Sequence, residues 1–151
     1  MADEDPATTL FREYVRIETV QPKPDYDGAM KFLIDYAKTL DLPYFTHECV
    51  PGKPIMIMTW EGTDPALTSV ILNSHTDVVP VFPEHWIHPP FSAHKDQKGN
   101  IYGRGTQVVW SDLTVFPVIG QLSPREISFG DNWPITGKTV KSLHTTCVPR
   151  P

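Results

Sequence analysis

The spacing of the apolar residues changes once along this chain, and that change constrains the fold more than any other feature. In the first forty or so residues, apolar side chains recur every three or four positions, which predicts amphipathic helices. One helix is expected over 6–17, and a second is expected to be capped by Asp27 and to end before Pro43. Beyond them the period is two, which predicts short strands over 44–50, 55–60 and 69–74. We therefore expect an α/β protein, with helices flanking a mixed sheet.

The last of these runs predicts where a ligand would bind. Val70-Ile71-Leu72 is apolar on both faces, which is typical of a central strand covered on both sides of a sheet. It leads directly into the polar sequence Asn73-Ser74-His75-Thr76-Asp77. Ligands of open α/β sheets usually bind at the carboxyl ends of central strands, so His75 and Asp77 are candidate site residues.

His75 and Asp77 lie two positions apart, so in an extended strand both side chains point to the same side. A histidine that binds a metal usually donates its second ring N–H to a carboxylate or a carbonyl, and Asp77 suits that role. A simpler interpretation is a histidine at a strand end that is hydrogen-bonded locally, with Asp77 starting a turn before Pro80. From spacing alone, the simpler interpretation is the more common one.

Composition limits the classes of partner. The 151 residues suffice for one domain and carry 13 basic and 18 acidic side chains, a net charge of −5, so we expect no nucleic-acid or anionic-membrane surface. No apolar run approaches the roughly 20 residues that span a bilayer, and the N-terminal sequence has no signal-peptide pattern. Two cysteines, Cys49 and Cys147, are expected to be reduced thiols in a cytoplasmic protein.

Three further features carry weaker signals. His85, His88 and His94 lie in a proline-rich stretch without a cysteine nearby, so loop packing is favoured over a zinc cluster. Gly103-Arg104-Gly105 is interpreted as a tight turn whose glycines allow close backbone approach, because no complete nucleotide-binding fingerprint is present. No Gly-x-Ser-x-Gly elbow occurs either, so a serine nucleophile has no support.

Taken together, three segments resemble the start of the aminoacylase family, the N-acyl-L-amino-acid amidohydrolases of the zinc aminopeptidase-like group. They are 69–80, which contains His75-Thr76-Asp77, then 86–91, and then 99–107, which contains Gly103-Arg104-Gly105. The segment 20–26 adds to the likeness, and the resemblance covers roughly residues 8–107.

This resemblance implies the N-terminal part of a zinc-exopeptidase-like catalytic domain. It implies a cytoplasmic, zinc-dependent hydrolase of amino acid metabolism that acts on a small N-acyl-L-amino acid through a metal-activated water. It also implies that His75 is a zinc ligand and that Asp77 is a catalytic carboxylate supporting the ligand shell. The family forms homodimers through a second domain, which we expect to be absent here.

One position departs from the family pattern. After Gly-Arg-Gly and two further residues, the family has an aspartate that bridges two zinc ions. This chain has Val108 at that position, with Asp112 four residues further on. The chain also lacks the Glu-Glu pair that gives the family its general base and a ligand. Only His75 and Asp77 remain, whereas an open catalytic zinc site usually has three protein ligands.

The resemblance ends where the character of the sequence changes. We therefore expect residues 1–107 to form a partial catalytic domain and residues 108–151 to be an unrelated, irregular and poorly ordered tail, produced by a retained intron or a changed reading frame. The isolated chain is expected to have little or no activity. Two alternatives stay open: a non-catalytic fragment that binds another protein chain through uncovered apolar sheet surface, and a related dipeptidase or deacylase.

Overall fold

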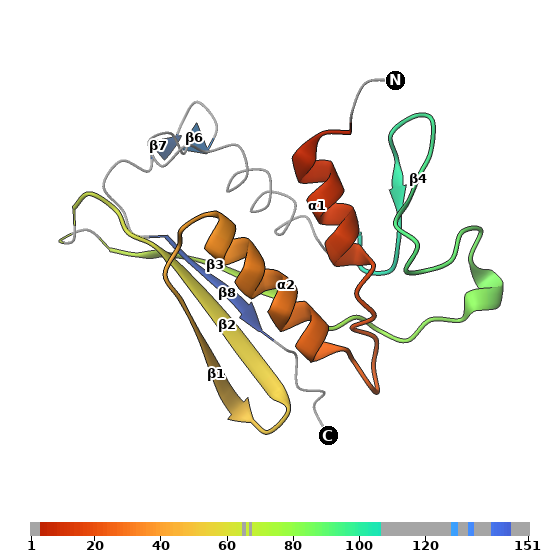
Figure 1. The fold of residues 1–151 in the computed structure, drawn as a ribbon, viewed down its shortest axis with the longest axis horizontal. Helices are drawn as coiled ribbons and strands as arrows, with labels where there is room; N and C mark the ends of the chain where they lie inside the picture. Colours follow the sequence, from red (N-terminus) through yellow and green to blue (C-terminus); the bar gives the residue numbers. More distant parts are fainter. Residues whose placement is uncertain are drawn as a thin grey trace.

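The computed structural model describes residues 4–64, 66, 68–106, 128–129, 133–134 and 140–145 (Figure 1). The predicted helices and strands are present, with ends that differ from the prediction by no more than three residues. In chain order the elements are α1 (Pro6–Val15), α2 (Tyr26–Thr39), β1 (Tyr44–Val50), β2 (Lys53–Trp60), β3 (Val70–His75), the short 3-10 helix η1 (Pro83–His85), β4 (His94–Lys95), β5 (Ile101–Tyr102), β6 (Ser128–Phe129), β7 (Trp133–Pro134) and β8 (Val140–Thr145).

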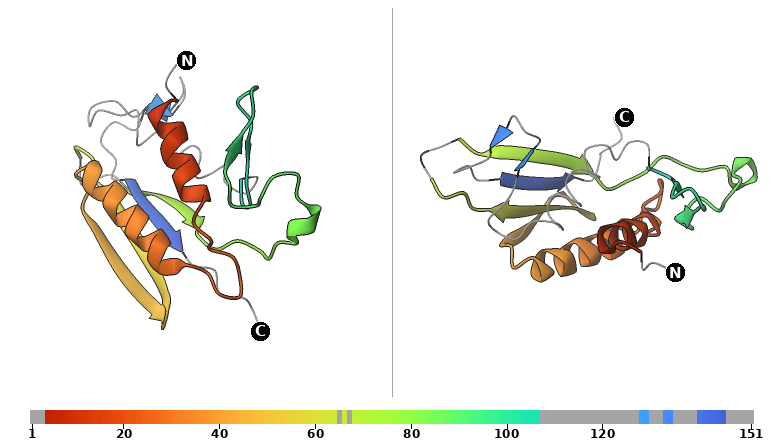
Figure 2. Two further views of the ribbon diagram at one scale, coloured as in Figure 1. Left: turned by 45° about the vertical axis from the view of Figure 1, so that its right-hand side comes forward. Right: turned by 90° about the horizontal axis from the view of Figure 1, so that it is seen from above.

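Within the described part of the chain, four strands form the main sheet, in the order β1-β2-β8-β3. The pairs β1–β2 and β2–β8 are antiparallel, whereas β8 and β3 are parallel, so the sheet is mixed as predicted. Figure 2 shows both helices on one face of this sheet. The chain is thus an α/β protein, and the predicted fold class is confirmed.

The position of β3 differs from the prediction. We expected its apolar run to be a central strand covered on both faces, but β3 lies at one end of the strand order and Ile71 is 64% exposed. That prediction is wrong because an apolar run does not specify strand order, and both helices cover the same face.

Strand β8, which lies between β2 and β3, comes from the segment for which the sequence predicted an irregular tail. Val108 and Asp112 lie outside the described residues, and so does the expected boundary at residues 107 and 108.

The main core forms where α2 packs on β2. Every third or fourth residue of α2 is buried, and the apolar face so formed meets Met56 and Met58, the two fully buried residues of β2. Leu33 is the largest side chain of the helix that is completely buried. Tyr36 lies on the same face, and its burial raises the pKa of the phenol to about 12.

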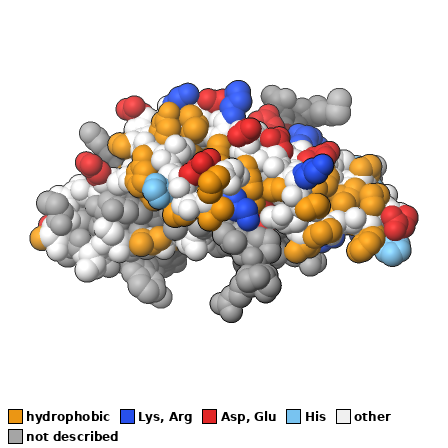
Figure 3. Space-filling model, turned by 90° about the horizontal axis from the view of Figure 1, so that it is seen from below, with side chains coloured by type: hydrophobic (Ala, Val, Ile, Leu, Met, Phe, Trp, Pro, Cys, Tyr) orange, Lys and Arg blue, Asp and Glu red, His pale blue; other side chains and the backbone are white. Residues whose placement is uncertain are grey.

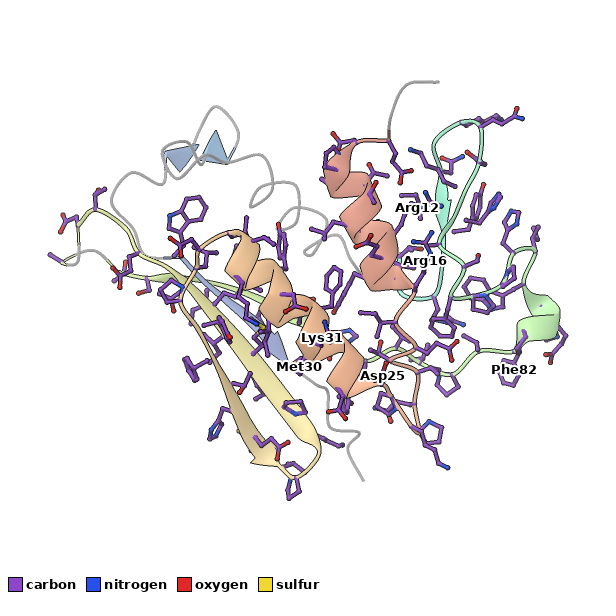
Figure 4. All side chains as sticks on the ribbon, viewed as in Figure 1. Arg12, Arg16, Asp25, Met30, Lys31 and Phe82 are labelled. Atoms are coloured by element: carbon purple, nitrogen blue, oxygen red, sulfur yellow. The ribbon has the colours of Figure 1, made fainter. Side chains whose placement is uncertain are left out.

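A smaller contact joins α1 to the β4–β5 hairpin. Phe11 and Val15 of α1 pack on Ala93, and Arg12 Nε donates to the carbonyl oxygen of Ala93 at 2.9 Å. Figure 4 shows Arg12 pointing from α1 toward this hairpin. Glu4 accepts hydrogen bonds from Lys95 (3.0 Å) and Arg12 (2.9 Å), and together they lower the pKa of its carboxyl to about 2.

The surface carries charges of both signs. On the face shown in Figure 3, acidic and basic side chains are interspersed, and neither sign gathers into a single patch. Within the described part of the chain, no helix has the length and apolar character needed to cross a membrane.

The start of α2 also differs from the prediction. Asp25, and not Asp27, is the N-cap residue, and its carboxylate accepts a hydrogen bond from the Gly28 N–H at 2.8 Å. Figure 4 labels Asp25 at this end of the helix. A Cβ atom at Gly28 would collide with the Asp25 carboxylate, so the glycine makes room for the cap. Asp27 lies in the first turn.

We expect Asp25→Ala to lower the free energy of unfolding by about 0.5–2 kcal/mol, because an N–H of the first turn loses its acceptor. Asp27→Ala is the matched control and is expected to cost less, since its carboxylate contributes only through the helix dipole. Urea denaturation of both variants measures the difference. A larger loss for Asp27→Ala would contradict the assignment of the cap.

Candidate functional site

His75 and Asp77 lie where β3 ends and the chain turns toward the first helices. His75 is the last residue of β3, and just beyond it Val78 forms an isolated parallel bridge with Val20. The Val78 N–H donates to the Thr19 carbonyl oxygen (2.9 Å), and the Gln21 N–H donates to the Val78 carbonyl oxygen (3.0 Å). This bridge attaches the candidate site to the loop before α2.

The structure brings the two predicted site residues together at one ring nitrogen. His75 Nδ1 lies 2.8 Å from the carbonyl oxygen of Asp77 and 3.3 Å from its carboxylate oxygen Oδ1. Both neighbours accept hydrogen bonds, so in the neutral ring Nδ1 carries the proton and Nε2 keeps its lone pair. The His75 side chain is 40% exposed, whereas that of Asp77 is only 10% exposed. Both interpretations of the sequence, a metal-binding histidine and a locally hydrogen-bonded one, include this hydrogen bond. A metal ligand also needs the lone pair that Nε2 keeps.

Gln21 joins this group, which sequence reasoning did not predict. Its side-chain Nε2 donates to Asp77 Oδ2 at 2.9 Å and lies 3.3 Å from the hydroxyl oxygen of Tyr26. The two oxygens of the Asp77 carboxylate therefore face different partners, with Oδ2 toward Gln21 and Oδ1 toward His75. The only signal in the sequence was the likeness of the segment 20–26 to the aminoacylase family, because no spacing rule relates residues 56 positions apart.

The Gly103-Arg104-Gly105 turn packs beside the same strand end. Gly105 has a φ of +90°, and a Cβ atom there would come within 2.9 Å of Val78 Cγ1. Arg104 lies over the ring of Trp86, 4.9 Å from its centroid, and its backbone N–H donates to the Pro90 carbonyl oxygen at 2.7 Å. These contacts agree with the interpretation of the segment as a tight turn that packs against the protein.

The three other histidines of the proline-rich stretch pack within it. The rings of His88 and His94 stack, with centroids 3.9 Å apart and planes inclined by 21°, and Tyr102 lies against both. Rings this close to parallel do not direct their nitrogen lone pairs at one metal ion. His85, in η1, is exposed. These contacts agree with the loop-packing interpretation.

The donors near His75 fit part of a metal centre. His75, with Nδ1 held by Asp77, has the arrangement of a single metal-binding histidine and its supporting carboxylate. Across the described residues, no three or more His, Cys, Asp or Glu side chains come together as a metal site. The described residues therefore do not supply the three protein ligands of an open catalytic zinc site.

Comparison with known proteins identifies the class to which this arrangement corresponds. Residues 71–110, which include His75, Asp77 and the glycine turn, match Peptidase family M20/M25/M40. An M20 family metallo-carboxypeptidase, Sso-CP2 from Sulfolobus solfataricus, has a similar structure, with a TM-score of 0.74 over 94% of this chain and 31% of that one, at 19% identity. The fold is thus that of an α/β fragment of an M20-type catalytic domain.

Sequence similarity is more specific. The chain is 59% identical over 147 residues to aminoacylase-1 of Mus musculus, which covers 97% of this chain and 34% of the relative. It is 55% identical over 105 residues to aminoacylase-1 of Homo sapiens, covering 70% of this chain and 26% of the relative. The aminoacylase resemblance found in the sequence is thus confirmed for the N-terminal part of the family, and the chain spans about a third or less of the length of these relatives.

The packing of the glycine turn can be tested with two glycines of similar backbone conformation. Gly99 has a φ of +86°, and a Cβ atom added there would meet no atom within 4 Å, whereas at Gly105 the new methyl group would meet Val78. We expect Gly99→Ala to lower the free energy of unfolding by about 1–2 kcal/mol through backbone strain alone. Gly105→Ala should cost more, and urea denaturation measures both. Equal losses would show that the turn does not pack against Val78.

Proposed function

We propose that this chain provides the N-terminal part of an aminoacylase-type active site, the site of hydrolysis of an N-acyl-L-amino acid to a carboxylate and a free amino acid. The observation that carries the proposal is the orientation of His75, whose Nδ1 is held by Asp77 while Nε2 keeps its lone pair. The identity of 55–59% to aminoacylase-1 of mouse and human supports the same substrate class. A role in amino acid metabolism is part of the same proposal.

The metal that the resemblance implies is zinc, with His75 as a ligand and Asp77 as the catalytic carboxylate that orients it. The residues that the structure describes do not complete the shell, so we assign no reaction step to the metal in this chain. Val108 stands at the position of the family's bridging aspartate, and a valine side chain has no lone pair to offer. Among the described residues and Val108, the proposed zinc site therefore has too few donor atoms for the metal.

We also propose a setting for the protein. The exposed, free thiol of Cys49 suits the reducing cytoplasm. A net charge of −5 and interspersed surface charges favour a small-molecule substrate over nucleic acid or an anionic membrane. The homodimer typical of the family would require segments of the relatives that this chain does not align with.

The 151-residue chain by itself is expected to show no hydrolysis of an N-acetyl-L-amino acid above background in the presence of zinc, because Val108 offers no donor and the described residues hold no group of three metal-binding side chains. Val108→Asp should tighten zinc binding measured by calorimetry, since it restores a carboxylate at the matching position. Val109→Asp adds the same charge one residue away and serves as the control. Stoichiometric, tight zinc binding by the unmodified chain would contradict the proposed ligand deficit.

The role of His75 itself can be tested in a chimera. Residues 1–107 of this chain would replace the corresponding segment of mouse aminoacylase-1, so that the relative supplies the remaining part of the site. We expect His75→Ala to lower kcat/KM for an N-acetyl-L-amino acid by more than about 100-fold, and Asp77→Asn by about 10–100-fold, as is usual for a partner of a metal ligand.

His94→Ala is the matched control in the chimera, because His94 stacks on His88 within the proline-rich stretch and is not part of the site. Its kcat/KM should remain that of the parent chimera. Retention of full activity by the His75→Ala chimera would refute the proposed function.

A further inference from the structure

We infer that Gln21 is the positioning residue for His75, and that it acts through both acceptor groups of Asp77. The inference rests on the proposed function, because it concerns the orientation of a histidine that we propose as a metal ligand. Gln21 lies in the loop before α2 and is separated from Asp77 by 56 positions in the sequence. It contacts the site with its main chain and with its side chain, and each contact restrains a different acceptor.

The main chain of Gln21 restrains the backbone of the site. Its N–H donates to the Val78 carbonyl oxygen at 3.0 Å, and the Val78 N–H returns a bond to the Thr19 carbonyl oxygen at 2.9 Å. These two bonds form the parallel bridge between Val20 and Val78 and hold the chain directly after Asp77. The carbonyl group of Asp77 is thereby kept 2.8 Å from His75 Nδ1.

The side chain of Gln21 restrains the carboxylate. Its Nε2 donates to Asp77 Oδ2 at 2.9 Å, and because a carboxylate is planar, holding Oδ2 also sets the direction of Oδ1. Oδ1 then lies 3.3 Å from His75 Nδ1. The Asp77 side chain is only 10% exposed, so water gives it little alternative solvation, and a direct donor matters more there than at the surface.

Gln21 is connected in turn to the helix. Its Nε2 also lies 3.3 Å from the hydroxyl oxygen of Tyr26. Tyr26 is the first residue of α2 and is only 8% exposed. An amide group has two N–H donors, so it can serve Asp77 and Tyr26 together. The buried Tyr26 at the start of α2 thus contacts Gln21, Gln21 donates to Asp77, and Asp77 orients the His75 ring. In the neutral form of the ring, this arrangement favours the proton on Nδ1 and leaves the lone pair on Nε2.

The test measures the tautomer of the His75 ring by ¹⁵N NMR of the 151-residue chain without metal, at a pH high enough to keep the imidazole rings neutral. In the unmodified chain we expect the Nδ1–H form to predominate. Gln21→Met keeps the length of the side chain but removes the donor, and should move the ring toward a mixture with the Nε2–H form. Gln21→Glu places an acceptor against the carboxylate and should move it at least as far.

Gln97→Met is the matched control, because Gln97 lies in the exposed turn between β4 and β5. It should leave the ring signals of His75 unchanged. A merely structural role for Gln21 would lower the urea midpoint of Gln21→Met without altering the His75 tautomer in the folded molecules, and that result would overturn the inference.

A second measurement needs no variant. The side-chain amide protons of Gln21 should exchange with solvent at least several-fold more slowly than those of Gln97 in the unmodified chain. Equal exchange rates would also overturn the inference. Neither NMR result depends on hydrolytic activity, so the inference can fail while the chimera confirms the proposed function, and the reverse is equally possible.

Discussion

The burial of one face of α2 against β2 is the contact on which the rest of the described structure depends. Leu33, Met56 and Met58 are completely or almost completely buried there, and they hold the helix at a fixed position on the sheet. The helix begins at Tyr26, where Asp25 caps it. The Val20–Val78 bridge joins the preceding loop to the residues just after β3. That loop carries Gln21 to the candidate site. Core packing and the orientation of His75 are thus linked through one short segment.

The supporting residues of the candidate site are joined by hydrogen bonds, but the described residues hold no group of three metal-binding side chains. His75 has two acceptors at Nδ1, and Asp77 has a separate donor for its second carboxylate oxygen. A pre-oriented histidine of this kind is what a metal centre requires of each ligand. It does not replace the missing ligands, because each protein donor occupies its own position around the ion. Whether the proposed site binds a metal therefore depends on the number of protein donors and on the residue at position 108.

Several features were predictable because they depend on neighbouring residues. The helical period and the switch to a period of two identified both helices and the first three strands, since these patterns report which side chains share a face. The pairing of His75 with Asp77 followed from their i, i+2 spacing. The errors arose where two alternatives are close in free energy, or where the outcome depends on residues far apart in the chain. Asp25 and Asp27 are both acceptable caps, and only the path of the loop after Pro24 decides between them. The apolar run of β3 did not indicate its place at one end of the strand order.

The sequence by itself determined the α/β class, the two candidate site residues, the aminoacylase resemblance and the presence of a valine at position 108, because each of these is a property of local pattern or residue type. The tertiary structure alone decided that Gln21 supports Asp77, that the glycine turn packs on Val78, and that His88 and His94 stack away from the site. These contacts join residues far apart in the chain, or depend on how loops pack. The physical reason is that such partners are selected by how the helices and strands pack together, which no local spacing encodes.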